Sequence, residues 1–204
     1  MGDSPATRAS LLVRLRDPRD HQAWSQFVDL YAPLVYRFGC KQGLQDADAA
    51  DLTQDTLQSV SGAIGRLDYD PKLGSFRGWL FTIVRNRLRD LLQKRGGQER
   101  GAGDTAMLDW LNQQPERHDD LAETWEREYD RQLLQTAARR IRGQFEETTW
   151  QAFWRTTVDG ESGKDVARGL DMTVAAVYLA KSRVMARLKE AIRKLQAEIS
   201  GDES

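Results

Sequence analysis

The sequence predicts an all-α protein in which two small helical domains are joined by a linker. Apolar residues recur at steps of three and four along most of the chain, and no sustained apolar–polar alternation marks a strand. Residues 116–204 contain no proline, which permits uninterrupted helices there. Glycines, one proline and little periodicity characterise the stretch between the helical regions. We therefore place the domains at 1–97 and 121–204, with an acidic linker at 98–120.

The composition excludes several classes of protein. The chain has 204 residues, of which 40% are hydrophobic and 30% charged, as in soluble globular proteins. Its single cysteine, Cys40, rules out an intrachain disulfide, and the two histidines, His21 and His118, lie outside any zinc-ligand spacing. No apolar run is long enough for a bilayer, and residues 1–10 lack a signal-peptide core. We expect a cytoplasmic protein with no metal, no cofactor and no membrane contact.

Three helices are expected in the first domain. Asp20 is the candidate N-cap of the first, Pro33 should bend or break it, and Gly43 should end it. Its apolar stripe consists of Ala23, Trp24, Phe27, Leu30, Tyr31, Leu34, Val35 and Phe38. A second helix should begin near residues 46–48 with Leu52, Leu57, Val60 and Ile64 as its apolar positions. After a loop rich in Asp, Gly and Pro, a third should run from about 76 to 94 and stop at Gly96-Gly97.

The second domain should end in a helix-turn-helix. Two amphipathic helices are expected over 121–141 and 145–158. A short helix should then start at Ser162 or Gly163, followed by a turn at Asp171-Met172 and a longer basic helix capped by Thr173. This plan suits DNA, because side chains near the start of the second helix reach base edges. The alternative is a helical hairpin with a polar face.

Charge is distributed as basic, acidic and basic segments although the formal net charge is only −1. Residues 72–100 and 172–194 are mainly basic, whereas residues 104–130 are mainly acidic. Two basic segments beside an acidic joint favour two contacts with a polyanion. The alternative is that these charges only keep exposed helix faces hydrated and bind no partner.

Two patterns in the first domain are candidate functional sites. Asp48, Asp51 and Asp55 follow helical spacing and share one face, which could dock a protein, complement the helix dipole or bind Mg²⁺. No histidine, lysine or phosphate-binding loop lies nearby, which disfavours metal catalysis. In residues 76–87 aromatic side chains alternate with arginines, a pattern suited to unpaired nucleic acid, although for Trp79 a place in the core is favoured.

Together these motifs resemble the extracytoplasmic-function (ECF) subfamily of bacterial RNA polymerase sigma factors over residues 24–192. DLTQD at 51–55 resembles the family's core-binding helix, and FRGWL…RN…D from residue 76 resembles its promoter-melting helix. The resemblance implies a factor that directs core polymerase to specific promoters and assists DNA melting without covalent chemistry of its own. It implies core RNA polymerase and promoter DNA as partners, an anti-sigma factor as a candidate partner, and a monomer when free.

The resemblance also implies roles for individual residues. Docking on the largest polymerase subunit falls to Asp48, Asp51, Leu52, Gln54 and Asp55. Recognition and opening of the −10 element falls to the loop 68–75 and the following helix, with Asp68, Lys72, Phe76, Arg77, Trp79, Arg85 and Asn86. Binding of the −35 element falls to Thr173, Ala175, Ala176, Tyr178, Lys181, Arg183 and Arg187. The linker would thread near the polymerase active-site channel.

This chain departs from the family pattern near the turn. Tyr178, Leu179 and Ala180 stand where the family often has basic or hydroxyl residues, and the basic charge follows later, at Lys181 and Arg183. Asp171 stands where glycine is frequent, but aspartate tolerates left-handed backbone geometry. The departures concern which −35 sequence is preferred.

Two other functions remain as alternatives. The first is a helix-turn-helix regulator with an N-terminal sensor domain, which would not need DLTQD or FRGWL. The second is a metal-dependent phosphohydrolase that uses Asp48, Asp51 and Asp55.

Overall fold

The computed structural model describes residues 10–66, 76–98 and 117–200. Within these ranges every regular element is an α-helix or a 3-10 turn, which confirms the all-α prediction. Two predicted segments fall outside the described residues, namely the loop with Asp68 and Lys72 and most of the linker at 98–120. In the part of the chain that is described, no helix has the length and apolar content needed to cross a membrane.

The chain forms two compact units whose boundary lies inside one helix, α6 (Arg117–Arg142), between Gln132 and Leu133. The boundary therefore falls later than the start of the predicted C-terminal domain at residue 121. The reason is that Leu121 and Trp125, in the first half of α6, are buried with the N-terminal helices.

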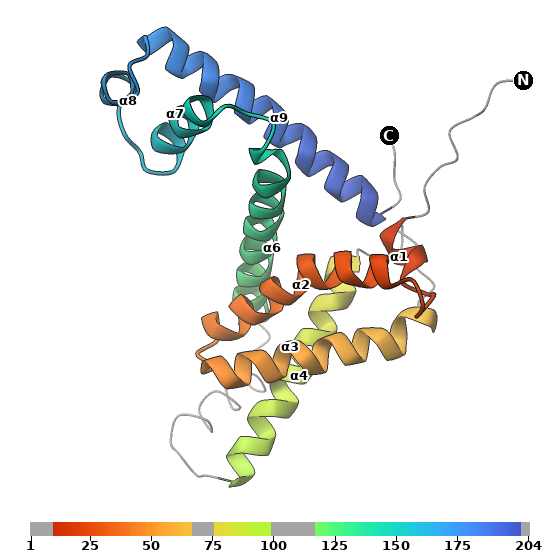
Figure 1. Cartoon of the computed structure of the whole chain (residues 1–204). Helices are drawn as coiled ribbons and strands as arrows, with labels where there is room; N and C mark the ends of the chain where they lie inside the picture. Colours follow the sequence, from red (N-terminus) through yellow and green to blue (C-terminus); the bar gives the residue numbers. More distant parts are fainter. Residues whose placement is uncertain (1–9, 67–75, 99–116, 201–204) are drawn as a thin grey trace, which may run out of the picture. The chain divides into compact units, whose positions relative to one another are not determined.

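The first unit contains α1 (Leu11–Arg14), α2 (His21–Lys41), α3 (Asp46–Ala63), the 3-10 turn η1 (Ile64–Arg66), α4 (Phe76–Gln98) and the first half of α6. Helices α2 and α3 pack along each other, and α4 packs against α3 (Figure 1). The predicted stop at Gly96-Gly97 was wrong, because α4 continues through both glycines to Gln98.

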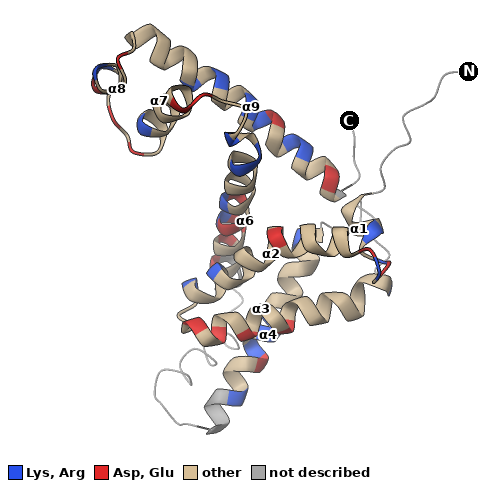
Figure 2. Cartoon of the chain, in the orientation of Figure 1, with Lys and Arg blue, Asp and Glu red and all other residues tan. Residues whose placement is uncertain are grey.

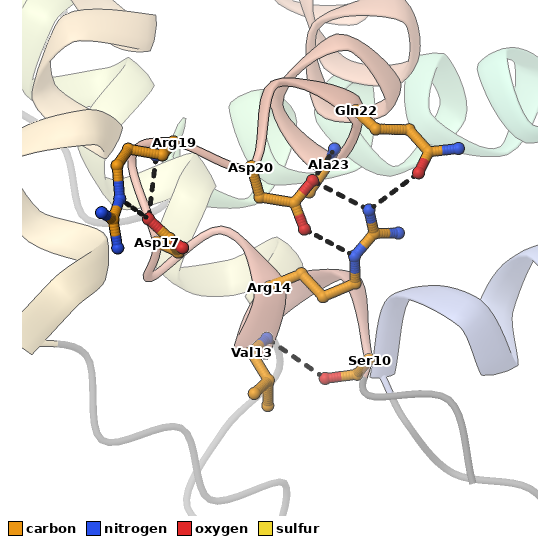
Figure 3. A network of polar contacts seen from close by, with 8 residues as sticks. All are labelled: Ser10, Val13, Arg14, Asp17, Arg19, Asp20, Gln22 and Ala23. Atoms are coloured by element: carbon orange, nitrogen blue, oxygen red, sulfur yellow. Dashed lines mark hydrogen bonds and ion pairs between the residues drawn. The ribbon is translucent and has the colours of Figure 1, made fainter. Parts of the chain in front are cut away.

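Asp20 begins α2 as predicted and also ties it to α1 (Figure 3). Its carboxylate accepts a hydrogen bond from the Ala23 backbone N–H at 2.9 Å and two from the Arg14 guanidinium at 2.8 and 2.9 Å. The hydrogen bond from Arg14, followed by that from Ala23, lowers the pKa of the Asp20 carboxyl. The cap thus stays charged and complements the positive end of the helix dipole.

Pro33 was expected to bend or break α2, and the helix runs through it without a break. Proline has no N–H, which leaves the carbonyl oxygen of Asp29 without its partner inside the helix. The side-chain amide of Gln132 in α6 donates to that oxygen at 3.4 Å. As predicted, Gly43 lies just beyond the end of the helix, in the left-handed region with a φ of 83°.

The core of the first unit is aromatic. Trp125 of α6 is 1% exposed, and its ring lies 5.5 Å from that of Phe38 and 5.7 Å from that of Phe81. Next to it, Arg37 pairs with the buried carboxylate of Glu128 at 3.2 Å. The first half of α6 is therefore an integral part of this unit.

The second unit contains the rest of α6, α7 (Glu147–Thr157), α8 (Gly163–Gly169) and most of α9 (Val174–Ser200). Helix α8 starts at Gly163, one of the two predicted starts, and Ser162 is its N-cap. The Thr173 hydroxyl accepts from the Ala176 N–H at 3.1 Å at the start of α9, the cap that was predicted. Asp171 adopts a φ of 52°, the left-handed geometry expected of the turn. The helices close on a small apolar cluster of Ala152, Val166, Ala167, Val177 and Ala180.

Candidate functional site

Helix α3 exposes only part of the predicted docking set. Figure 2 shows acidic residues in the first half of this helix, which contains no Lys or Arg. Asp51, Gln54 and Asp55 are exposed. Leu52 is fully buried and Asp48 is 7% exposed, so neither side chain lies on the surface that a partner can reach. Both face the core because they fall on the side of α3 that packs inside the unit.

An apolar groove lies beside this exposed face. Its volume is about 510 Å³, and it runs between Pro33 and Tyr36 of α2 and Ala50, Gln54 and Leu57 of α3. Gln54 belongs both to the groove and to the exposed face of α3. An apolar floor beside a polar and acidic edge is a common arrangement for binding another protein.

Two residues of the predicted −10 set have structural roles at the start of α4. Phe76 is 3% exposed, and its ring packs 5.6 Å from that of Tyr31. The Arg77 guanidinium pairs with Glu126 of α6 at 2.8 Å and lies 4.8 Å above the ring of Tyr129. These side chains thus hold α4 to α2 and α6.

The rest of the predicted −10 set lies further along α4. Asn86 is exposed, whereas Arg85 and Trp79 are half-buried. Arg87 in the same turn donates to the Ser59 hydroxyl of α3 at 2.7 Å and pairs with Asp90 at 3.3 Å. This side of α4 therefore carries polar and basic groups at its surface.

The start of α9 carries the predicted −35 set. Thr173, Ala175, Tyr178 and Arg183 are exposed, whereas Ala176 and Lys181 are half-buried. Arg187 pairs with Glu190 and donates to the Gln144 side chain at 2.7 Å. Protein groups therefore hold its guanidinium, and its role is at least in part to fix α9 to the α6–α7 connection.

No metal centre is found in the described ranges. There, no three His, Cys, Asp or Glu side chains are grouped closely enough to hold an ion. Asp48 is buried while Asp51 and Asp55 are exposed, so the three carboxylates of the phosphohydrolase alternative do not share one environment.

Comparison with known proteins identifies the N-terminal part. The family model of sigma-70 region 2 matches residues 27–98, a span that includes α3, the groove and α4. Residues 27–98 are therefore similar to sigma-70 region 2. This matched span holds every residue of the predicted docking and −10 sets.

The curated relatives that the chain matches are ECF RNA polymerase sigma factors. The chain is 34% identical over 85 residues to the ECF RNA polymerase sigma factor RpoE of Cereibacter sphaeroides. This match covers 42% of this chain and 46% of the relative. The chain is 35% identical over 74 residues to the ECF sigma factor SigE of Mycolicibacterium smegmatis, a match that covers 36% of this chain and 27% of the relative. It is 32% identical over 88 residues to the ECF sigma factor BldN of Streptomyces coelicolor, a match that covers 43% of this chain and 33% of the relative. The match spans less than half the length of each relative. It confirms the predicted resemblance to ECF sigma factors.

The contacts that join α2 and α4 to α6 were not predicted from the sequence. Glu126, Tyr129 and Gln132 were assigned to the C-terminal domain, yet they contact Arg77, Tyr31 and Asp29. The available signal was Pro33 itself, since a proline inside a strongly periodic helix requires some other donor for the freed carbonyl.

Proposed function

We propose that this chain is an ECF-type sigma factor that directs bacterial core RNA polymerase to specific promoters and assists DNA opening. The observation that supports it most is the region 2 match over residues 27–98, because that span contains both candidate surfaces. The chain itself performs no covalent step, and cytoplasmic polymerase supplies the chemistry.

The docking surface is the exposed face of α3. Asp51 and Asp55 offer carboxylates to a basic partner, and Gln54 connects them with the apolar groove against α2. Asp48 and Leu52 act indirectly, since their burial fixes the orientation of α3. Charges at such a rim mainly set the association rate and specificity, while the apolar groove contributes affinity.

The −10 surface is the exposed side of α4. Asn86 provides hydrogen-bonding groups for a base edge, Trp79 a ring for stacking and Arg85 a cation for phosphate. Phe76 and Arg77 support this surface from within the unit rather than contacting DNA.

The −35 surface is the start of α9, with α8 as its supporting helix. A helix-turn-helix presents the first residues of its second helix to the major groove. The exposed residues Ala175 and Tyr178 lie in that position, and exposed Arg183 follows them. Lys189, Arg193 and Lys194 continue the positive charge along α9.

Substitution of Asp51 tests the docking surface. Because Asp51 is exposed, Asp51→Arg should leave the thermal unfolding curve unchanged and weaken binding to purified core polymerase at least about tenfold, the effect of ~1.4 kcal/mol. Asp130→Arg, an equal charge change at an exposed position of α6, is the matched control and should bind as the parent does. Unchanged affinity of Asp51→Arg in a pull-down titration would contradict the docking assignment.

A further inference from the structure

The outward side of α9 begins with apolar rather than basic side chains. Tyr178 is 58% exposed and Leu179 is 52% exposed, and exposed Ala175 lies one turn before them. Isolated exposed apolar residues are ordinary, but two large neighbours on the first turns of one helix form a patch.

The packing of the second unit does not require this patch. Val177, Ala180 and Val184 fill the core side of the same turns and are at most 5% exposed. Leu179 therefore contributes little to the interior, and its apolar area remains in contact with water.

The ring of Tyr178 lies against the first turn of α8. A Cβ atom at Gly163 would stand 3.1 Å from both the Cζ and the hydroxyl oxygen of this ring. The absence of a side chain at Gly163 lets the ring rest on the backbone, so Tyr178 is partly held in place while Leu179 is not covered.

Positive charge follows the patch along α9. Arg183 is exposed and Lys181 half-buried, and within the described residues no ion pair is found for either. On α8, Arg168 pairs with Asp165 at 3.6 Å, and exposed Lys164 adds positive charge. An apolar centre with cationic flanks complements the major groove, in which phosphates border the bases and the thymine methyl is the apolar group.

We propose that Leu179, with Tyr178 beside it, reads thymine methyl groups in the −35 element. Specificity at this position then comes from apolar contact, and Lys181 and Arg183 anchor the adjoining phosphates. This inference rests on the proposed function of α8 and α9 as the −35 reader, and it names the base and the group on that base that they recognise.

The test compares thymine with uracil, which lacks only the methyl group. The full chain with core polymerase is first used to select bound duplexes from a random library, and the upstream element is then synthesised with single uracil replacements. One methyl contact should contribute about fourfold in affinity. We expect a thymine preference at one or two positions and a fourfold loss with uracil there, whereas Leu179→Ala should bind both duplexes equally.

Controls separate this inference from the proposed function. Val158→Ala removes another exposed apolar side chain of the second unit and should keep the full uracil effect. Uracil placed outside the element should leave the affinity unchanged. Sequence-selective binding without a methyl effect in the parent overturns this inference alone. Absence of any sequence-selective binding overturns the proposed function together with it.

Discussion

At the residue scale, Gln132 links α6 to α2 by two hydrogen bonds. Its amide donates to the Asp29 carbonyl that Pro33 leaves unpaired, and its oxygen accepts from the Arg37 guanidinium at 2.5 Å. Gln132 is 1% exposed, so water cannot replace it easily. A buried polar side chain is thus retained here because a proline in another helix creates the need for a donor.

Substituting Gln132 with leucine should therefore destabilise the protein through Pro33. Gln132→Leu should lower the free energy of unfolding by about 1–3 kcal/mol, the cost of leaving a buried polar group unpaired. In a Pro33→Ala background the helix supplies its own N–H to Asp29, so the same substitution should cost about 1 kcal/mol less. Urea unfolding of the four variants measures this coupling, and an equal cost in both backgrounds would contradict the account.

Individual residues also show why burial within the predicted sites could be inferred only in part. Leu52 and Phe76 belong to motifs that resemble functional ones, but a motif does not say which side of a helix is covered. Leu52 already stood among the apolar positions of its helix, so its burial could have been inferred from periodicity. The pairing of Arg77 with Glu126 could not, because 49 positions of sequence separate the two charges and only the tertiary fold brings them together.

At the element scale, the starts of helices could be predicted from the sequence. The division of one helix, α6, between two units could not. Asp20 and Thr173 cap the helices they were expected to cap, since capping involves only neighbouring residues. The apolar stripe of α6 runs without interruption from Leu121 to Ile141, and nothing in it marks the change from one unit to the other. The division depends on which partner helices each half meets.

The connection between α7 and α8 should make the second unit sensitive to acid. Arg155 donates to both carboxylate oxygens of Glu161 at 2.7 and 2.6 Å, and this hydrogen bonding lowers the pKa of the Glu161 carboxyl. A carboxyl whose pKa is lower when folded contributes stability above its unfolded pKa and loses it as the pH falls through the folded value. The melting temperature should therefore fall on acidification below the ordinary glutamate range.

Glu161→Gln isolates this effect. The variant keeps a hydrogen-bond acceptor but cannot titrate, so its melting temperature should start lower at neutral pH and fall less between pH values of about 5 and 3. Thermal unfolding followed by circular dichroism at several pH values provides the comparison. Parallel curves for parent and variant would show that this pair does not contribute to the pH dependence.

Helix α4 should separate promoter opening from polymerase binding. Asn86 is exposed and supports no other element, so Asn86→Ala should leave core binding unchanged and reduce opening about tenfold, as expected for the loss of one or two base contacts. Permanganate reactivity of unpaired thymines measures opening, and Thr82→Ala at another exposed position of α4 is the control. Equal reactivity of Asn86→Ala and parent would exclude this role.

At the scale of the whole molecule, basic and acidic segments offset each other, so the chain is almost neutral. The formal net charge is −1, although α4 and α9 are mainly basic. A chain that bound all DNA tightly through its charge would be titrated by nonspecific sites. In the proposed function, two modest DNA surfaces and one protein surface engaged together would give avidity that none provides alone. The acidic residues of 104–130, together with those of α3, offset the basic charge of α4 and α9.

The most direct test of the central claim is transcription by purified bacterial core polymerase on fragmented genomic DNA, with and without this chain, followed by mapping of transcript starts. We predict discrete new starts that share two spaced upstream elements and disappear with Asp51→Arg. If the same core polymerase is active with a control sigma factor but yields no new starts with this chain, the sigma-factor account is contradicted and a polymerase-independent regulator is favoured.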